Sequence, residues 1–237
     1  MDILIPEHNK REIVQPTKVE VKEYPLTVHV VAGTQASQAN ENAVYFMKWS
    51  QLHKTRFDDE SQIIGEDDIE ENDEPELNVL SIKHPHAVNR IRSMNGSSIV
   101  ALWDESGAVS IYDGTKHTQI LAEYDEEANE LLGENEKVKL KAPKDTNKKN
   151  FLLSQFQHDS EGFALGWSPH TLGLFATGSC DKKIFFYTLA DENGSWVMDT
   201  TPFTAHKGSV EDLQFSPNNA NLLASCKLLS LGNLYIT

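Results

Sequence analysis

A pattern that recurs at one fixed interval constrains the fold of this chain more than any other feature of its sequence. Each copy starts at a histidine and runs through alternating apolar and polar residues into a Ser-Pro pair. Such alternation is typical of β-strands, and the residue before a proline favours an extended end. The matched positions are His158 and His206, Leu165 and Leu213, Trp167 and Phe215, Ser168-Pro169 and Ser216-Pro217, and Ala176 and Ala224. We call the interval from His158 to His206 the repeat spacing; each copy predicts short strands separated by turns.

A third, weaker copy lies upstream of these two. His84 begins it, and Ile91 takes the place of Leu165. Its later half, residues 103–113, aligns with residues 178–188, so that Val109 falls on Ile184 and Tyr112 on Tyr187. Each unit then holds about four short strands. Self-similarity at a fixed interval of this length is the signature of repeat architectures such as solenoids and propellers.

Acidity is concentrated in one segment of the chain. The 237 residues carry a net charge of −15, which becomes −4 when residues 57–76 are left out, because this segment holds 11 carboxylates and no Lys or Arg. The acidic residues are Asp58, Asp59, Glu60, Glu66, Asp67, Asp68, Glu70, Glu71, Asp73, Glu74 and Glu76. We call these eleven residues the acidic tract. Like charges at this density repel one another, which favours an extended, disordered loop.

The acidic tract has two interpretations. It is either a docking surface that attracts Lys- and Arg-rich proteins over a Debye length of about 8 Å at physiological salt, or a solvated loop without a particular partner. Calcium binding is a weaker alternative, because residues 66–76 lack the ligand spacing and the glycine of an EF-hand loop. A strongly acidic balance argues against direct binding of nucleic acid.

Several functional classes find no support in the sequence. No secretory signal is evident, and no apolar run is long enough to predict a membrane segment. Cys180 and Cys226 fit a reducing compartment and lack an assignable catalytic base. The pair His84 and His86 lacks a third metal ligand nearby. Without a phosphate-binding loop, nucleophile elbow or zinc-peptidase helix, the sequence predicts no enzyme, cofactor or metal site.

The four tryptophans are spread along the chain with one in each cluster of strands. They are Trp49, Trp103, Trp167 and Trp196. A role in stacking on nucleic acid bases is the alternative to a role in the core. Their distribution favours packing in the core, where a large aromatic side chain contributes most.

The repeat resembles the WD-repeat pattern, in which one unit is a four-stranded propeller blade. The resemblance is carried by a histidine, a strand ending in an aromatic residue and Ser-Pro, then Ala-Thr-Gly-Ser-x-Asp-x-x-Ile-x-x-Tyr. In such blades a buried polar network joins His, Ser or Thr, Asp and Trp. Carried onto this chain, the structural network comprises His158, Thr177, Asp181 and Tyr187, the last in place of Trp, with His206 starting the next unit. Ser106 stands where the Asp belongs in the earlier unit, which predicts a weaker network there.

A closer resemblance covers residues 24–226. The sequences AGTQ and HKGSVEDLQFSP, together with an acidic insert after the first blade, resemble the glutamate-rich WD-repeat proteins of the nucleus and nucleolus. This resemblance implies a chaperone-like scaffold that binds basic proteins, namely histones and a ribosomal protein, in ribosome biogenesis and chromatin assembly. An alternative from another class is an adaptor that presents substrates to a ubiquitin ligase scaffold, as some WD-repeat proteins do.

The predicted fold class is all-β: a partial WD-repeat propeller with about three and a half of an expected seven blades. The predicted segments are an N-terminal extension (1–23), first-blade strands (24–56), an acidic disordered loop (57–76), a second blade (77–122), a charged connection (123–150), a third blade (151–204), the start of a fourth (205–226) and an aberrant tail (227–237). The family's histone-binding helix is expected to be missing from the first segment. Lys227 and Leu229 stand where the blade pattern has Ser179 and Asp181, so the sequence predicts a truncated form.

Overall fold

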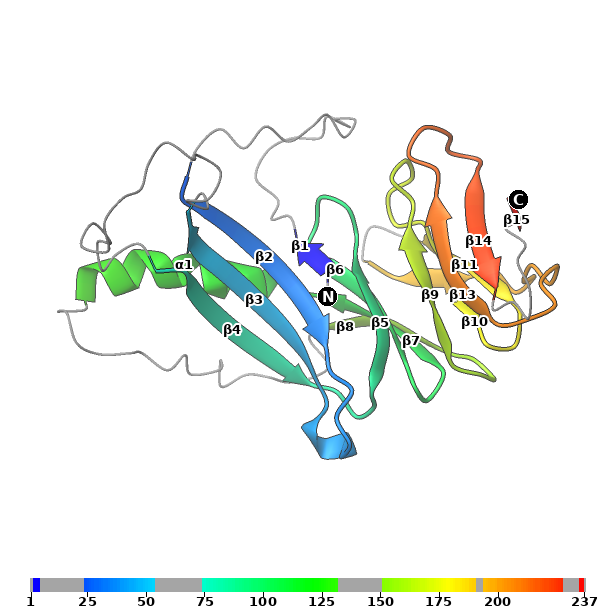
Figure 1. The fold of residues 1–237 in the computed structure, drawn as a ribbon, viewed down its shortest axis with the longest axis horizontal. Helices are drawn as coiled ribbons and strands as arrows, with labels where there is room; N and C mark the ends of the chain where they lie inside the picture. Colours follow the sequence, from blue (N-terminus) through cyan, green and yellow to red (C-terminus); the bar gives the residue numbers. More distant parts are fainter. Residues whose placement is uncertain are drawn as a thin grey trace, which may run out of the picture.

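The computed structural model describes residues 2–4, 24–53, 74–131, 151–190, 194–227 and 235–236. Strands dominate these residues and form antiparallel sheets in which neighbours along the chain are also neighbours in the sheet. Figure 1 shows the sheets following one another across the molecule, in chain order. This is the arrangement of consecutive blades in a propeller.

The strands fall into four sheets within the described residues. The first contains β1 (Asp2–Leu4), β2 (Leu26–Gly33), β3 (Ala43–Leu52) and β4 (Glu76–Lys83); the second contains β5 (Val88–Ser93), β6 (Ile99–Asp104), β7 (Ala108–Asp113) and β8 (Leu152–Gln157). The third contains β9 (Gly162–Trp167), β10 (Phe175–Ser179), β11 (Ile184–Leu189) and β12 (Trp196–Met198); the fourth contains β13 (Val210–Phe215), β14 (Leu223–Lys227) and β15 (Tyr235–Ile236). A 3-10 turn, Ala39–Glu41, joins β2 to β3.

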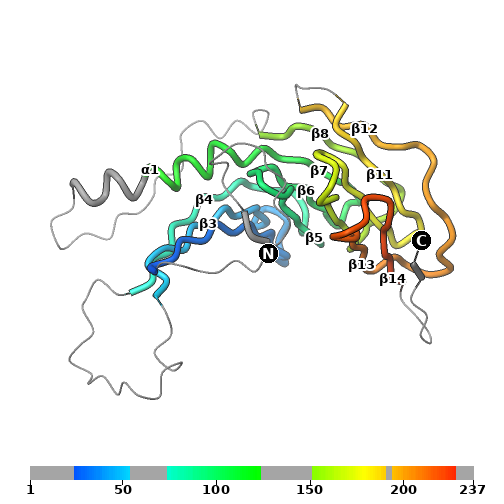
Figure 2. The backbone as a smooth tube through the Cα atoms, turned by 90° about the horizontal axis from the view of Figure 1, so that it is seen from above, coloured from blue at the N-terminus to red at the C-terminus, as the bar shows by residue number. Residues whose placement is uncertain are grey.

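Neighbouring sheets meet through the strands at one edge. β1 and β2 contact β5, β5 contacts β9, and β9 contacts β13. Seen from above, the sheets follow one another along an arc, with the first sheet at one end and the fourth at the other (Figure 2). The fold is therefore a partial WD-repeat β-propeller, with three four-stranded sheets and a three-stranded fourth among the described residues.

The first two sheets end one strand later than the blade ranges predicted from the sequence. β4 lies in the range predicted for the second blade but pairs with β3 of the first sheet, for example Phe46 with Leu80. β8 lies in the predicted third blade but pairs with β7 of the second sheet. The histidine that opens each repeat follows the outer strand of one sheet and precedes the inner strand of the next. The repeat that starts at a histidine therefore coincides with one sheet, whereas the ranges predicted for the second and third blades each start with the outer strand of the preceding sheet.

The first residues of the chain also differ from the predicted extension. β1 pairs antiparallel with β2, in the register Asp2 to Val31, Ile3 to Val30 and Leu4 to His29. It takes the edge position in the first sheet that β5, β9 and β13 take in theirs. An inner strand as short as this has too little alternation to be recognised from sequence.

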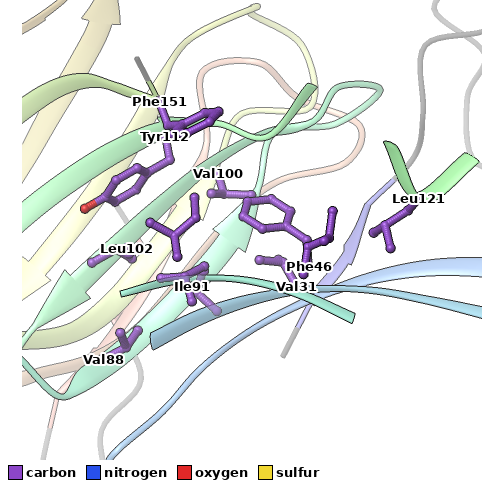
Figure 3. Close-up of a cluster of buried hydrophobic side chains, with 12 residues drawn as sticks. Val31, Phe46, Val88, Ile91, Val100, Leu102, Tyr112, Leu121 and Phe151 are labelled. Carbon is purple, nitrogen blue, oxygen red and sulfur yellow. The ribbon is translucent and has the colours of Figure 1, made fainter. Parts of the chain in front are cut away.

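A hydrophobic core joins the first two sheets. Figure 3 shows Val31 and Phe46 of the first sheet close to Ile91, Val100 and Leu102 of the second. These side chains are almost completely shielded from solvent. At about 25 cal/mol for each Å² of buried apolar surface, such clusters supply most of the favourable free energy of folding.

A second core joins the second and third sheets, and buried tryptophans dominate it. The indole of Trp103 donates from Nε1 to the carbonyl oxygen of Ala164 at 3.0 Å, and Trp167 donates to that of Arg92 at 3.0 Å. Each bond crosses from one sheet to the other. Because a buried indole N–H needs an acceptor, these bonds fix the separation of the two sheets as well as satisfying the rings.

A helix, α1 (Thr115–Leu131), stands between β7 and β8, where the sequence predicts none. Its residues fall within the ranges predicted for the second blade and for the charged connection. Its start follows a local turn in which the Thr115 N–H donates to Asp113 Oδ1 at 2.9 Å. His117 then stacks on Phe46 with a ring-centroid distance of 4.7 Å, and Leu121 joins the core of the first two sheets. In the described parts of the chain, no helix combines the length and apolar character needed to span a membrane.

The predicted aberrant tail contributes a strand to the fourth sheet. Tyr235 pairs with Ser225, and Ile236 pairs with Ala224. In the third sheet, the residues one repeat spacing before Ser225 and Ala224 are Thr177 and Ala176, and they pair with Phe185 and Phe186. The tail thus reaches the third-strand position with an offset two residues longer than the repeat spacing, and the ungapped alignment missed it.

Candidate functional site

The third sheet brings together three of the residues predicted to form its polar network. His158 Nε2 lies 2.5 Å from the hydroxyl of Tyr187, and that hydroxyl lies 3.2 Å from Thr177 Oγ1. Thr177 and Tyr187 lie on the neighbouring strands β10 and β11, while His158 follows β8 of the preceding sheet. The contact therefore links two sheets through one buried hydroxyl group, which is a structural role.

Burial controls the protonation of this network. Removal from solvent lowers the pKa of His158 to about 4, against the smaller opposing effect of the Asp181 carboxylate. Burial also raises the pKa of Tyr187, because the phenolate is even less stable there. Both groups are consequently neutral at physiological pH.

Asp181 takes a different position from the one predicted. Its carboxylate forms an ion pair with Lys183 at 2.5 Å rather than bonding to His158, and its side chain is 26% exposed. The pKa of Asp181 lies below its usual value: burial alone would raise it, and the bonds from Lys183 and Ser179 more than offset that. Asp181 shapes the turn between β10 and β11 without joining the buried network.

The second sheet contains a carboxylate network that the sequence interpretation missed. His84 Nε2 lies 3.1 Å from Asp104 Oδ2, with both side chains almost fully buried. Asp104 Oδ1 also accepts from the N–H and hydroxyl groups of Ser106, at 2.9 and 2.6 Å, and from the N–H of Ala108 at 3.2 Å. The Tyr112 hydroxyl lies 3.4 Å from the other ring nitrogen of His84. Rather than being weaker, this network holds a buried carboxylate.

The tautomer of His84 follows from these partners. An ionised carboxylate only accepts hydrogen bonds, so Nε2 carries the proton toward Asp104 and Nδ1 accepts from Tyr112. The pKa of Asp104 lies below its usual value: burial would raise it, and the hydrogen bonds from His84 and Ser106 outweigh that effect. The ionised form is therefore the stable one.

The two networks differ by an exchange of two residue types. The second sheet has Asp104 and Ser106, whereas the aligned positions of the third sheet are Ser179 and Asp181. In both sheets the first of these side chains accepts from the backbone N–H two residues later, from Ser106 at 2.9 Å and from Asp181 at 3.2 Å. Asp at the earlier position also reaches the histidine. The sequence indicates this arrangement at residues 103–106, Trp-Asp-Glu-Ser, where the Asp directly follows the tryptophan.

The fourth sheet has a smaller version of the same contact. His206 Nε2 lies 2.8 Å from the hydroxyl of Ser225. Ser225 stands one repeat spacing after Thr177 and holds the same place in β14 that Thr177 holds in β10. Burial lowers the pKa of His206, with a smaller contribution from Lys227.

No arrangement of side chains in the described residues supports the metal-binding or reactive-cysteine alternatives. The rings of His84 and His86 lie 6.5 Å apart, and His84 is engaged by Asp104 and Tyr112. In the described residues, no three His, Cys, Asp or Glu side chains gather to hold a metal ion. Cys180 and Cys226 are half-buried free thiols.

The acidic tract joins β3 to β4 at one end of the first sheet. Nine of its eleven carboxylates, from Asp58 to Asp73, lie outside the described residues. Glu74 and Glu76 are described and exposed, and Glu76 is the first residue of β4. It accepts from the Ser50 hydroxyl at 3.4 Å. The tract is consequently tethered at both ends to paired strands of the first sheet.

An exposed apolar pair lies beside this connection. Trp49 of β3 pairs with Leu77 of β4, and the two side chains are 39% and 48% exposed. The prediction that Trp49 is a core residue was wrong, whereas Trp103, Trp167 and Trp196 are buried. β3 is rich in apolar residues on both faces, so alternation gave no indication of which face is covered. We call Trp49 and Leu77 the rim pair.

Comparison with known proteins places the chain among WD-repeat proteins. It is 41% identical over 217 residues to the glutamate-rich WD repeat-containing protein 1 of Dictyostelium discoideum, covering 86% of this chain and 41% of that protein. It is 34% identical over 213 residues to the ribosome assembly protein rrb1 of Schizosaccharomyces pombe, covering 87% and 40%. The histone acetyltransferase type B subunit 2 of Aspergillus fumigatus is 26% identical over 223 residues, covering 89% and 46%.

No family model matches the chain. The chain spans less than half the length of these relatives. The similarity nevertheless extends over 86 to 89% of this chain. This chain belongs to the family of glutamate-rich WD-repeat proteins.

Proposed function

We propose that this chain is a non-enzymatic scaffold that binds basic proteins, namely histones and a ribosomal protein, during ribosome biogenesis and chromatin assembly. The observation that carries the proposal is the placement of the acidic tract, which is tethered between two paired strands of a packed sheet. The names of two relatives, a ribosome assembly protein and a histone acetyltransferase subunit, support the same setting. That setting is nuclear and nucleolar.

The proposed mechanism is charge neutralisation. A Lys- or Arg-rich client approaches a segment with 11 carboxylates and no cation of its own. Opposite charges accelerate the encounter and offset the client's self-repulsion. Because the tract's charges are numerous and solvated, the free energy of binding should depend strongly on salt. No cofactor takes part in this mechanism.

The rim pair gives the client a second kind of contact. Trp49 and Leu77 are exposed at the strand ends from which the acidic tract departs. The aliphatic stems of Lys and Arg pack on apolar surface while their charged groups stay in water, and Trp is the best ring for a cation. A basic segment held by the tract therefore meets an aromatic surface beside it.

The test replaces Asp and Glu in residues 58–73 by Asn and Gln, which leaves β4 and Glu76 in place. The control keeps every carboxylate and scrambles the order of residues 58–73. Binding of purified core histones and of a basic ribosomal protein is measured by fluorescence anisotropy at salt concentrations below and above the physiological one, where the Debye length is about 8 Å. We expect the neutralised variant to lose both affinity and salt dependence, and the scrambled variant to keep both.

Equal affinity and an equal salt slope in the neutralised variant would exclude the mechanism. If ubiquitin ligase scaffold subunits instead co-purify with the chain at high salt, and do so without the carboxylates, the adaptor function is the better assignment. The two functions are distinguishable because only the binding of basic proteins by the acidic tract depends on charge.

A further inference from the structure

Three of the nine prolines in the chain directly follow a serine or a threonine, at Ser168-Pro169, Thr201-Pro202 and Ser216-Pro217. A serine or threonine followed by proline is the minimal substrate motif of proline-directed protein kinases. The sequence gives these three hydroxyl groups equal standing as phosphate acceptors. The structure separates them, because an acceptor hydroxyl group has to be accessible to the nucleotide held by the kinase.

Ser168 and Ser216 use their hydroxyl groups to close turns. Ser168 Oγ accepts from the N–H groups two and three residues later, at 3.2 and 3.1 Å, and the residue is buried. Ser216 Oγ accepts from the N–H groups at the same two offsets, at 3.3 and 3.1 Å, and the residue is half-buried. A phosphate on either oxygen would break the turn that follows its strand, so the role of these two hydroxyl groups is structural.

Thr201 has neither constraint. It follows β12 in a segment without regular strand structure, and its side chain is exposed. Among the described residues, its hydroxyl group has no hydrogen-bond partner; its N–H donates to Asp199 Oδ1 at 2.8 Å. Modification of the Thr201 hydroxyl group therefore costs the fold no existing contact of that group.

The segment around Thr201 is attached to the third sheet at two points. The N–H of Asp199 donates to the carbonyl oxygen of Phe186 at 2.8 Å, and Phe203 exchanges two backbone hydrogen bonds with Ile184, at 2.9 and 3.0 Å. Between these points, residues 200–202 stand opposite a single residue of β11. Extra residues on one strand bend it away from its partner, so Thr201 protrudes from the edge of the sheet.

A small local opening is enough to give a kinase an extended substrate segment here. Thr204 and Ala205 belong to no strand and are exposed, so breaking the two hydrogen bonds of Phe203 frees residues 200–205. The side chain of Phe203 is 55% exposed and contacts the ring of Phe186 at a centroid distance of 5.4 Å. Edge segments with few buried contacts open at low free-energy cost. The hydroxyl group of Thr201 can therefore be presented without unfolding the sheet.

We propose that Thr201 is the site at which a proline-directed protein kinase phosphorylates this chain. ATP is the phosphoryl donor. In the transfer, Thr201 Oγ1 forms a bond to the γ-phosphorus, the bond from that phosphorus to the oxygen of ADP breaks, and the hydroxyl proton goes to the carboxylate base of the kinase. The acidic tract takes no part in this modification.

The phosphate would change how this segment is held. A phosphothreonine carries a charge of about −1.5 to −2 at neutral pH. The carboxylate of Asp199 lies beside it, because that carboxylate accepts from the N–H of Thr201. Like charges at this distance repel one another, so the turn opens and the bonds between Phe203 and Ile184 weaken. Phosphorylation of Thr201 thus releases the edge segment from β11.

The test incubates the full chain with Mg²⁺ and ATP and, in separate reactions, a purified mitogen-activated protein kinase and a purified cyclin-dependent kinase. Mass spectrometry of proteolytic peptides then locates the phosphate. We expect Thr201 to carry the phosphate, with Ser168 and Ser216 left unmodified. Thr201→Val should abolish the incorporation. Thr200→Val is the matched control, an exposed neighbouring threonine with no proline after it, and should leave the incorporation unchanged.

A second readout is the hydrogen exchange of the backbone amides of Ile184 and Phe203, which are bonded to one another. In the phosphorylated chain these two amides should exchange at least about tenfold faster, equivalent to about 1.4 kcal/mol of local stability. The amide of the buried Thr177 in β10 should exchange at the same rate in both forms.

Absence of phosphate on Thr201 with both kinases would overturn the proposal, and so would preferential modification of Ser168 or Ser216 in the folded chain. Unchanged exchange of the Ile184 and Phe203 amides in the phosphorylated chain would overturn the release of the edge segment. None of these measurements involves a basic client, so the proposed binding of histones and of a ribosomal protein is tested separately.

Discussion

The carboxylate of Asp104 and the imidazole of His84 face one another at 3.1 Å in the interior of the second sheet. Asp104 follows a core tryptophan at the end of β6, and His84 follows β4 of the neighbouring sheet. The bond therefore links one sheet to the next. Its counterpart in the third sheet, between His158 and Tyr187, links sheets without a charge.

Replacing Asp104 by Ala should destabilise the fold far more than replacing Asp181 by Ala. The first change leaves His84 and the turn N–H groups of Ser106 and Ala108 without their acceptor, which costs on the order of 3 kcal/mol. Asp181 pairs with Lys183 near the surface, where such pairs contribute less than about 1 kcal/mol. Urea unfolding measures both. If the two variants lose the same free energy of unfolding, the carboxylate of Asp181 stabilises the fold as much as that of Asp104.

Stability should fall as the pH is lowered through the range between 6.5 and about 4. Burial lowers the pKa of His158 from 6.5 to about 4 in the fold, so the unfolded chain binds the extra proton first. At about 1.4 kcal/mol for each unit, the loss attributable to His158 approaches about 3 kcal/mol. His158→Gln, which retains a hydrogen-bonding group for Tyr187, should flatten the profile.

The control for this experiment is His86→Gln, since His86 is substantially exposed. His117 and His206 also have pKa values lowered by burial, so some dependence on pH will persist in the His158 variant. Urea midpoints at neutral and mildly acidic pH give the comparison. A profile that His86→Gln flattens and His158→Gln does not would contradict the assignment.

Trp103→Phe should cost more stability than Trp49→Phe. Trp103 is fully buried and donates across the sheet boundary to the carbonyl oxygen of Ala164. Its loss leaves that oxygen unpaired, at about 1 to 3 kcal/mol, and adds a small cavity. Trp49 is exposed, so its replacement should change the free energy of unfolding by less than about 0.5 kcal/mol. Thermal and urea unfolding provide the measurement.

The fluorescence of Trp49 should be distinguishable from that of the three buried tryptophans. Acrylamide should quench one fraction of the tryptophan emission, and that fraction should be absent in the Trp49→Phe variant. Because Glu74 and Glu76 are exposed next to the rim pair, caesium ions should quench this fraction more effectively than iodide at low salt. Equal quenching by the two ions would indicate that the carboxylates do not influence the rim pair.

The sequence repeat predicted short strands separated by turns because it records both the strand alternation and the turn residues, and the WD-repeat resemblance predicted the propeller arrangement. It could not assign strands to sheets. The outer strands β4 and β8 lack a motif of their own, and only their pairing with β3 and β7 reveals their sheet. Alternation shows that a strand exists and says nothing about which neighbour it joins.

The polar network was predicted in part. His158, Thr177 and Tyr187 meet as the WD-repeat resemblance implied, but Asp181 turns toward Lys183. The carboxylate that does reach a histidine, Asp104, stands two residues earlier in its unit than the pattern requires. Asp104 is the last residue of β6 whereas Asp181 lies in the turn after β10, so only the earlier position brings a carboxylate to the histidine.

The helix and the rim pair were missed for different reasons. α1 follows a strand directly, and its start depends on Asp113 capping Thr115, a local bond that resembles any turn. Trp49 lies in a strand with apolar residues on both faces, where only the packing of neighbouring sheets decides which face is covered.

The position of α1 also determines where the arc of sheets can bend. His117 is held between the rings of Phe46 and Phe151, so opening the joint between the first two sheets would have to pull an imidazole out of an aromatic clamp. At the other end, the third and fourth sheets are joined by a hydrophobic core in which Val210 and Leu213 pack with Ala164 and Ala176. The aromatic clamp therefore makes the amino-terminal joint of the arc resistant to opening.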